Sequence, residues 1–287
     1  MSLWLLILGL SLLNYVMRFI RWKIYINKLQ PSVVIPFVTH LKIYLAGFAL
    51  TTTPGKSGEL VRSLYLVKLG IQYKNSVSAF FVERFIDLIS MLLLSLLCGL
   101  IFTQYQTLTL AIAPGLLLLF VLLRTNSIWE RIQGVDFRPR LVCVFVNKLA
   151  KILVSSSSLL GNKMLLVGGV IGVFAWGAEG LALYFISDAL ALDIDPLVAI
   201  SIYSIAVLLG ALTFIPGGLG GTEAVMGLML MTMGASSSDA LVATLVCRVA
   251  TLWFAVFVGL IAMASLGRLP TSLLVEESTM RCARAEQ

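Results

Sequence analysis

Long apolar segments that carry almost no charge are the feature that most constrains this chain. Residues 2–17, 75–101, 107–123, 164–188 and 238–265 each form such a segment, about as long as a helix that crosses the hydrocarbon of a bilayer. A single soluble core does not account for them, because 59% of the 287 residues are hydrophobic and only 12% are charged. We therefore predict an all-α polytopic membrane protein with about five spanning helices.

Two further apolar segments, 36–53 and 196–214, end in sequences that break helices. The first runs into Pro-Gly-Lys-Ser-Gly-Glu at 54–59, and the second runs into Pro-Gly-Gly-Leu-Gly-Gly-Thr-Glu at 216–223. Proline removes a backbone donor and glycine favours non-helical angles, so each sequence should interrupt its helix. Because unwound backbone at membrane depth needs protein or water to satisfy its polar groups, we predict two re-entrant hairpins whose breaks face a cavity. The residues expected to shape the breaks are Pro54, Gly55, Gly58, Pro216, Gly217, Gly218, Gly220 and Gly221.

The net charge of +7 is unevenly distributed along the chain. Lys and Arg gather after the first predicted helix, where Arg18 and Arg21 open the connection, before residue 75, throughout 124–163 and in the tail 268–287. The connections near 103–107, 188–195 and 234–239 contain no Lys or Arg. This alternation is typical of the positive-inside rule and predicts that the basic loops and the C-terminus are cytoplasmic. The charge therefore indicates membrane topology and attraction to anionic headgroups rather than nucleic-acid binding.

The first and last parts of the chain also resemble each other. A shift of 164 residues matches two acids, two arginines and two glycines: Glu59 with Glu223, Arg84 with Arg248 and Gly70 with Gly234. We predict an inverted repeat of helix, hairpin and helix, with halves at 2–101 and 164–265 in a single transmembrane domain, 1–267. A helix at 107–123 and a basic cytoplasmic loop at 124–163 would join the halves, and 268–287 would form a cytoplasmic tail.

Ionisable residues inside the predicted membrane segments are the candidate site. A charge at the bilayer centre costs about 3 kcal/mol even on the lenient insertion scale, so these groups should pair or face water. Glu59 and Arg62 can share a helix face, while Glu83 and Asp87 form an acidic face beside Arg84. Acids on one face need a cation, and an arginine from the other half is a candidate. Arg or Lys near glycine-rich backbone amides is typical of phosphate binding, which indicates a lipid phosphate as ligand.

Simpler interpretations of the same residues remain open. Glu59 and Glu223 each follow a glycine-rich break, where a carboxylate complements the dipole of the next helix. The acidic and basic cluster around Arg84 would also serve as a static ion-pair network. Glu179 is a further acid in a membrane segment, and His40 is more typical of a core or interfacial residue than of a proton relay. Neither a catalytic triad nor a metal or nucleotide motif occurs in the sequence, and the four cysteines have no disulfide or zinc spacing.

The motifs at 54–62, 83–87 and 216–224, followed by Arg248, resemble the lysylphosphatidylglycerol synthase transmembrane region, also called the flippase-like domain family. The resemblance extends from about residue 18 to residue 259. It implies a bacterial or archaeal inner-membrane protein that moves a lipid or lipid-linked intermediate between leaflets. By similarity, the functional positions are Glu59, Arg62, Glu83, Arg84, Asp87, Glu223 and Arg248.

The chain departs from this family in two respects. Members usually carry one more N-terminal helix, whereas this chain starts almost directly in what resembles the second. A soluble aminoacyltransferase domain does not follow the last predicted helix, which argues against synthesis of aminoacylated lipid by this chain alone.

These observations predict a non-enzymatic lipid translocator without metal or cofactor. An anionic headgroup would lie between the two hairpins, held by Lys56 and the acids and arginines named above. The alternative is a non-transporting accessory subunit of an envelope glycosyltransferase or lipid-modifying enzyme, in which the polar network is structural. Membrane lipids are the expected partners, and envelope-biosynthesis enzymes or a second copy of the chain are left open.

Overall fold

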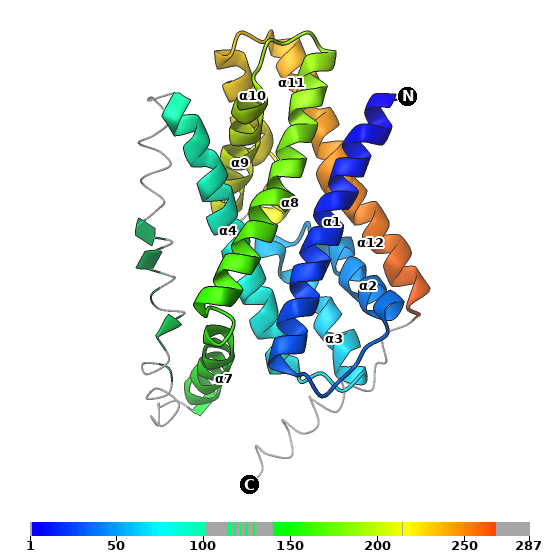
Figure 1. Cartoon of the computed structure of the whole chain (residues 1–287), viewed down its shortest axis with the longest axis vertical. Coiled ribbons are helices and arrows are strands. Elements are labelled where there is room, and N and C mark those ends of the chain that lie inside the picture. Colours follow the sequence, from blue (N-terminus) through cyan, green and yellow to red (C-terminus); the bar gives the residue numbers. More distant parts are fainter. Residues whose placement is uncertain are drawn as a thin grey trace.

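The computed structural model describes residues 2–101, 140–213 and 215–267, together with 114–115, 117–118, 121, 124–125 and 129. Helices dominate these residues and no strand occurs among them (Figure 1). Three helices are long and apolar enough to cross a membrane: α1 (Ser2–Leu29), α8 (Asn162–Ala189) and the continuous helix Ser237–Ser265. A fourth long helix, α4 (Tyr73–Ile101), carries three charged residues in its middle. The all-helical membrane class is therefore confirmed, while the predicted helix 107–123 lies largely outside the described residues.

Helix α1 is longer than the sequence analysis predicts. It was expected to end at residue 17, but it continues to Leu29 because the sequence has neither glycine nor proline between Gly9 and Pro31. The assignment of Arg18 and Arg21 to a basic cytoplasmic connection is therefore wrong. Both arginines lie inside the helix, where they are 4% and 0% exposed. Their charges must be neutralised within the protein.

Both predicted helix breaks are present in the structure. The first segment consists of α2 (Phe37–Ala46), η1 (Gly47–Leu50), η2 (Pro54–Leu60) and α3 (Val61–Lys68), and Gly55 and Lys56 have φ angles of 60° and 55°. The second consists of α9 (Pro196–Leu212), η3 (Pro216–Gly218) and α10 (Gly221–Thr232), with φ angles of 66° at Gly217 and 65° at Gly218. Left-handed backbone of this kind cannot continue an α-helix.

The two broken segments enter the helix bundle from opposite ends. Figure 1 shows α2 and α9 running inward from the lower and upper ends, and α3 and α10 returning to the end from which each segment came. The breaks η2 and η3 pack against each other at the middle of the molecule. The end of α1 and the starts of α4 and α8 lie at the lower end of Figure 1, and the end of α8 and the start of α9 lie at the upper end. The first group of helix ends carries Lys28, Lys74 and Lys163, and the second carries Asp188 and Asp195.

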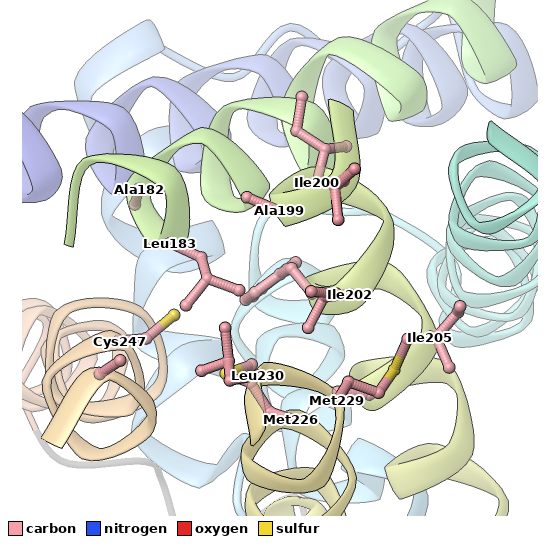
Figure 2. Packing of buried hydrophobic residues seen from close by; sticks show 14 of the residues in the cluster. Ala182, Leu183, Ala199, Ile200, Ile202, Ile205, Met226, Met229, Leu230 and Cys247 are labelled. Carbon is pink, nitrogen blue, oxygen red and sulfur yellow. The ribbon is translucent and has the colours of Figure 1, made fainter. Parts of the chain in front are cut away.

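The remaining helices enclose the breaks. Helix α1 packs against α8, α4 packs against α8 and α9, and α12 (Phe254–Ser265) packs against α2 and η1. Figure 2 shows part of one buried cluster, in which Leu183 of α8, Ile202 of α9 and Leu230 of α10 meet Cys247 of α11 (Ser237–Arg248). A second cluster is more aromatic and gathers residues of α1, α2 and α4. Helix α7 (Arg140–Ser157) packs beside α4.

A π-helical turn, η4 (Val249–Trp253), separates α11 from α12. Such a turn leaves carbonyl groups out of register with the α-helical ladder. Helix α1 supplies donors to two of them: the Ser11 hydroxyl donates to the Ala250 carbonyl at 2.8 Å, and the Tyr15 hydroxyl donates to the Thr251 carbonyl at 2.8 Å. The turn places Arg248 at the end of α11, beside the second helix break.

Candidate functional site

A network of buried charges is centred on the acids of α4. Glu83 accepts hydrogen bonds from Arg62 of α3 at 2.5 Å and from the Tyr44 hydroxyl of α2 at 2.6 Å. Asp87 is bonded to Arg21 of α1 and accepts a hydrogen bond from Trp176 of α8 at 3.0 Å. Elements far apart in the sequence therefore converge on two carboxylates, which matches the requirement that membrane charges be paired.

Arg84 links these acids to the first helix break. Its guanidinium lies 3.2 Å from Glu83, 3.0 Å from Asp87 and 3.7 Å from Glu59. Glu59 also accepts a hydrogen bond from the Thr51 hydroxyl at 2.9 Å. The predicted acidic face beside Arg84 is thus present, with Glu59 completely buried behind the break.

Arg248 and Glu223 form an ion pair at the second break, as Arg84 and Glu59 do at the first. Arg248 Nε donates to Glu223 Oε1 at 2.5 Å, and Arg248 Nη2 donates to the Gly217 carbonyl at 2.7 Å. Glu223 Oε2 accepts a hydrogen bond from the Gly220 amide at 2.6 Å, which satisfies a free donor at the start of α10. Glu223 therefore has the helix-start role that the sequence analysis considered, in addition to its ion pair.

Among the described residues, no arginine of one half forms an ion pair with an acid of the other, so the candidate pairing between the halves is not present. Arg248 pairs with Glu223 of its own half, and the acids of α4 pair only with arginines from α1, α3 and α4. The acids of α4 are neutralised in part by Arg18 and Arg21 of α1, which the sequence analysis did not include in the site. The sequence does indicate this role, because Ser11, Asn14, Arg18 and Arg21 form a polar stripe at helical spacing within an apolar segment. All four residues are buried in the structure.

A cavity of about 290 Å³ lies where the two breaks meet. Gly55 and Lys56 of the first break line it together with Gly217 and Gly218 of the second. Its other charged lining residues, with its tyrosines and tryptophan, come from five helices and are Tyr15, Arg18, Arg84, Asp87, Trp176, Glu179, Tyr203 and Arg248. The prediction that both breaks face one cavity is therefore met in the structure.

Among the described residues, three cations that line the cavity have donors without a hydrogen-bond partner: Arg18, Lys56 and Arg84, of which Arg84 has the closest ion pairs. Arg18 Nη2 lies 3.7 Å from Glu83 and 3.8 Å from Asp87, but its Nε and Nη2 atoms have no hydrogen-bond partner. The Arg18 guanidinium carbon lies 5.1 Å from the centre of the Phe48 ring and 5.3 Å from the centre of the Trp176 ring.

Lys56 is the second of these cations. Its Nζ lies 5.3 Å from the centre of the Trp176 ring, and it forms no ion pair with a described carboxylate. Buried donors without acceptors are rare in proteins, and a cavity that gathers them beside cations is suited to bind an anion.

The sequence-predicted residues divide into two groups in the structure. Lys56, Arg84, Asp87 and Arg248 line the cavity, as do the backbone residues Gly55, Gly217 and Gly218. Glu59, Arg62 and Glu83 lie behind these residues and are fully buried, while Glu223 holds Arg248. Pro54, Gly58, Pro216, Gly220 and Gly221 shape the breaks without lining the cavity. No group of acids, histidines or cysteines among the described residues has the arrangement of a metal site.

Comparison with known proteins gives two matches. A family model described as "Lysylphosphatidylglycerol synthase TM region" matches residues 1–259, a range that contains both helix breaks and Arg248. A "UPF0104 membrane protein" from Methanothermobacter thermautotrophicus is 30% identical over 120 residues, which are 42% of this chain. The matched part spans 36% of the length of that relative.

Proposed function

Because this chain belongs to the lysylphosphatidylglycerol synthase TM region family, and is thus a multi-pass membrane protein, we propose that it moves an anionic lipid or lipid-linked intermediate between leaflets. The observation that carries the proposal is the cavity between the two helix breaks, with the unpartnered donors of Arg18 and the unpaired Lys56 in its wall. A lipid phosphate supplies the oxygen acceptors and the negative charge that these cations lack.

The depth of the cavity supports translocation rather than surface binding. The breaks meet midway between the basic and acidic ends of the bundle, and each break belongs to a segment that enters from one end (Figure 1). Two re-entrant hairpins of this kind, related as an inverted repeat, would let the site open to either leaflet by moving one hairpin at a time. The basic end of the bundle would then face the cytoplasm of a bacterial or archaeal cell.

The contact between the hairpins supports a gating role for the breaks. A side-chain carbon at Gly217 would lie 3.5 Å from both Thr52 and Leu252, so the tips touch with little room between them. This is ordinary van der Waals contact, and glycine is favoured at position 217 because its φ of 66° is left-handed. Separating the tips would connect the cavity to the bilayer, and closing them would exclude water from the bound headgroup.

A second candidate function, that of a structural accessory subunit, is favoured by the acids behind the cavity, which already have ion-pair partners. Glu83 and Asp87 each pair with several arginines, which is also what a static scaffold needs. An accessory subunit of an envelope enzyme would need this network but not the free donors of Arg18 and Lys56. Loss of function on removing those donors alone therefore favours the translocator.

The decisive experiment is leaflet-resolved lipid movement in proteoliposomes that contain only this protein. Vesicles carrying a fluorescent anionic phospholipid are treated with an impermeant quencher, and the rate at which inner-leaflet lipid becomes accessible is measured. Wild-type protein should raise this rate over protein-free vesicles, and the double variant Arg18→Gln with Lys56→Gln should abolish the increase. Lys74→Gln with Lys163→Gln removes the same charge from exposed positions and should transport like wild type. Equal rates with and without wild-type protein would refute the proposal.

A further inference from the structure

Glu179 of α8 is a buried acid that the ion pairs leave out. Only 4% of its surface is exposed, and it lines the central cavity. The Tyr203 hydroxyl of α9 donates a hydrogen bond to its Oε2 at 2.5 Å. No described Lys, Arg or His forms an ion pair with it, whereas each of the other four acids near the cavity pairs with an arginine: Glu59, Glu83, Asp87 and Glu223.

Besides Tyr203, charged and titratable groups of the neighbouring elements face Glu179 at longer range. They are Tyr15 and Arg18 of α1, Lys56 of η2, and Cys247 and Arg248 of α11, while Arg84 and Asp87 of α4 line the same cavity. Arg18, Lys56 and Arg248 favour the ionised carboxylate, and burial away from water favours the neutral acid. The balance between the two forms therefore depends on what else occupies the cavity.

An anion in the cavity would shift this balance toward the neutral acid. Arg18 has ion pairs only at 3.7 and 3.8 Å and Lys56 has none among the described residues, so a phosphate would bind to them and offset the charge that stabilises the carboxylate. The phosphate would also repel the carboxylate directly, because both groups line the same cavity of about 290 Å³. Binding of the anion and uptake of a proton from water by the carboxylate are thus linked.

We propose that Glu179 is a proton-binding site that is loaded together with the anionic headgroup, so that one proton moves with each lipid. This inference rests on the proposed function, because it assigns the coupling ion of the same site. With Glu179 ionised, the empty cavity holds a carboxylate opposite Arg18 and Lys56; with lipid bound, the phosphodiester takes over that negative charge. The net charge of the site is then the same before and after loading, which avoids burying an extra charge in hydrocarbon.

Proton uptake on binding can be measured directly by titration calorimetry. The purified full chain in detergent is titrated with dihexanoyl phosphatidylglycerol, a soluble anionic phosphodiester, in buffers that differ in ionisation enthalpy. Wild-type protein should take up close to one proton per lipid bound at a pH where Glu179 is ionised. Glu179→Gln keeps the shape of the side chain and an acceptor for Tyr203, and it should bind the lipid with a much smaller proton uptake, the remainder of which comes from Lys56. Asp193→Asn removes an exposed acid and should behave like wild type.

The wild-type protein also provides a test that needs no variant. If one proton is taken up with each anion, lipid affinity falls by up to about tenfold per pH unit above the titration of Glu179. Lys56 also titrates, and its contribution is the part of the pH dependence that Glu179→Gln retains.

The outcomes separate the two proposals. Lipid binding without proton uptake, or equal uptake by Glu179→Gln, overturns the role of Glu179 and leaves the translocator standing. An affinity that stays constant across the pH range does the same. Failure of folded wild-type protein to bind the lipid overturns the anion site itself, and the proton site with it.

Discussion

Replacing Arg18 and Arg62 separately by glutamine should distinguish a ligand-binding arginine from a structural one. Arg62 donates to Glu83 at 2.5 Å and stacks on Trp22 with 3.8 Å between the guanidinium carbon and the ring centre. Loss of a charge-assisted hydrogen bond costs about 1.5 to 3 kcal/mol, and loss of the desolvated cation–π contact about 1 to 2 kcal/mol. Arg62→Gln should therefore destabilise the fold by about 3 to 5 kcal/mol, the range found when a buried ion pair loses one partner.

The same accounting gives Arg18 a much smaller structural role. Its Nε and Nη2 atoms have no hydrogen-bond partner, and its ring contacts at 5.1 and 5.3 Å are worth about 0.5 to 1 kcal/mol each. Arg18→Gln should thus cost only about 1 to 2 kcal/mol of stability, since Glu83 and Asp87 keep their other arginines. A lost charged contact to phosphate is worth about 1.5 to 3 kcal/mol, which weakens lipid binding about 10- to 150-fold.

The assay compares both variants in stability and in function. Unfolding midpoints are measured in detergent, lipid affinity by calorimetry, and translocation in proteoliposomes with rates normalised to the amount of inserted protein. The reasoning is refuted if Arg18→Gln binds and transports lipid like wild type. It is also refuted if Arg18→Gln unfolds as readily as Arg62→Gln, because both arginines would then be structural.

Three further predictions test the topology, the second ion pair and the contact between the breaks. In a variant without native cysteines, single cysteines replacing the exposed Asp193 and Ser237 should react with an impermeant reagent only from outside, and those replacing Lys74 and Lys163 only from the cytoplasm; labelling of positions 74 and 237 from one side would exclude a second re-entrant hairpin. Arg248→Gln should destabilise the fold by about 2 to 4 kcal/mol, and adding Glu223→Gln should recover part of that loss in unfolding experiments; a double variant no more stable than the single one would contradict the pairing. Gly217→Ala forces a side chain to adopt a φ of 66° and should cost about 1 to 2 kcal/mol and slow lipid movement, whereas Gly9→Ala in α1, with open space around it, should not destabilise; equal unfolding midpoints would count against strain at the break.

The helix breaks could be predicted because their causes are local. Proline and glycine act on the backbone of their own segment, so Gly55 and Gly217 interrupt their helices whatever packs around them. The shift of 164 residues matches Arg84 with Arg248 and Glu59 with Glu223, and in the structure each arginine lies within ion-pair distance of the glutamate of its own half. The relation of the hairpins to the bilayer stays a prediction.

Other features depended on packing that sequence position does not determine. Arg18 and Arg21 were assigned by their place after an apolar run, although the polar stripe along α1 indicated a buried face. Glu179 was recognised as an acid at membrane depth, but its partner Tyr203 lies 24 residues away on another helix. Which arginine neutralises which acid likewise follows from the crossing of α1, α3 and α4, because several pairings satisfy the same sequence spacing.

The distribution of charge between the two halves explains why the cavity needs both of them. The first half contributes an excess of cations, since Arg18, Arg21, Lys56, Arg62 and Arg84 share only Glu59, Glu83 and Asp87. The second half contributes a neutral pair, Glu223 with Arg248, and the unpaired acid Glu179. A cavity between them therefore places spare cations opposite one acid, so that a bound phosphate competes with Glu179 for the same positive charge. In this arrangement the same cations stabilise either the ionised carboxylate of Glu179 or the bound phosphate. The cations come from the first half and the acid from the second, so neither half would couple the anion to the proton alone.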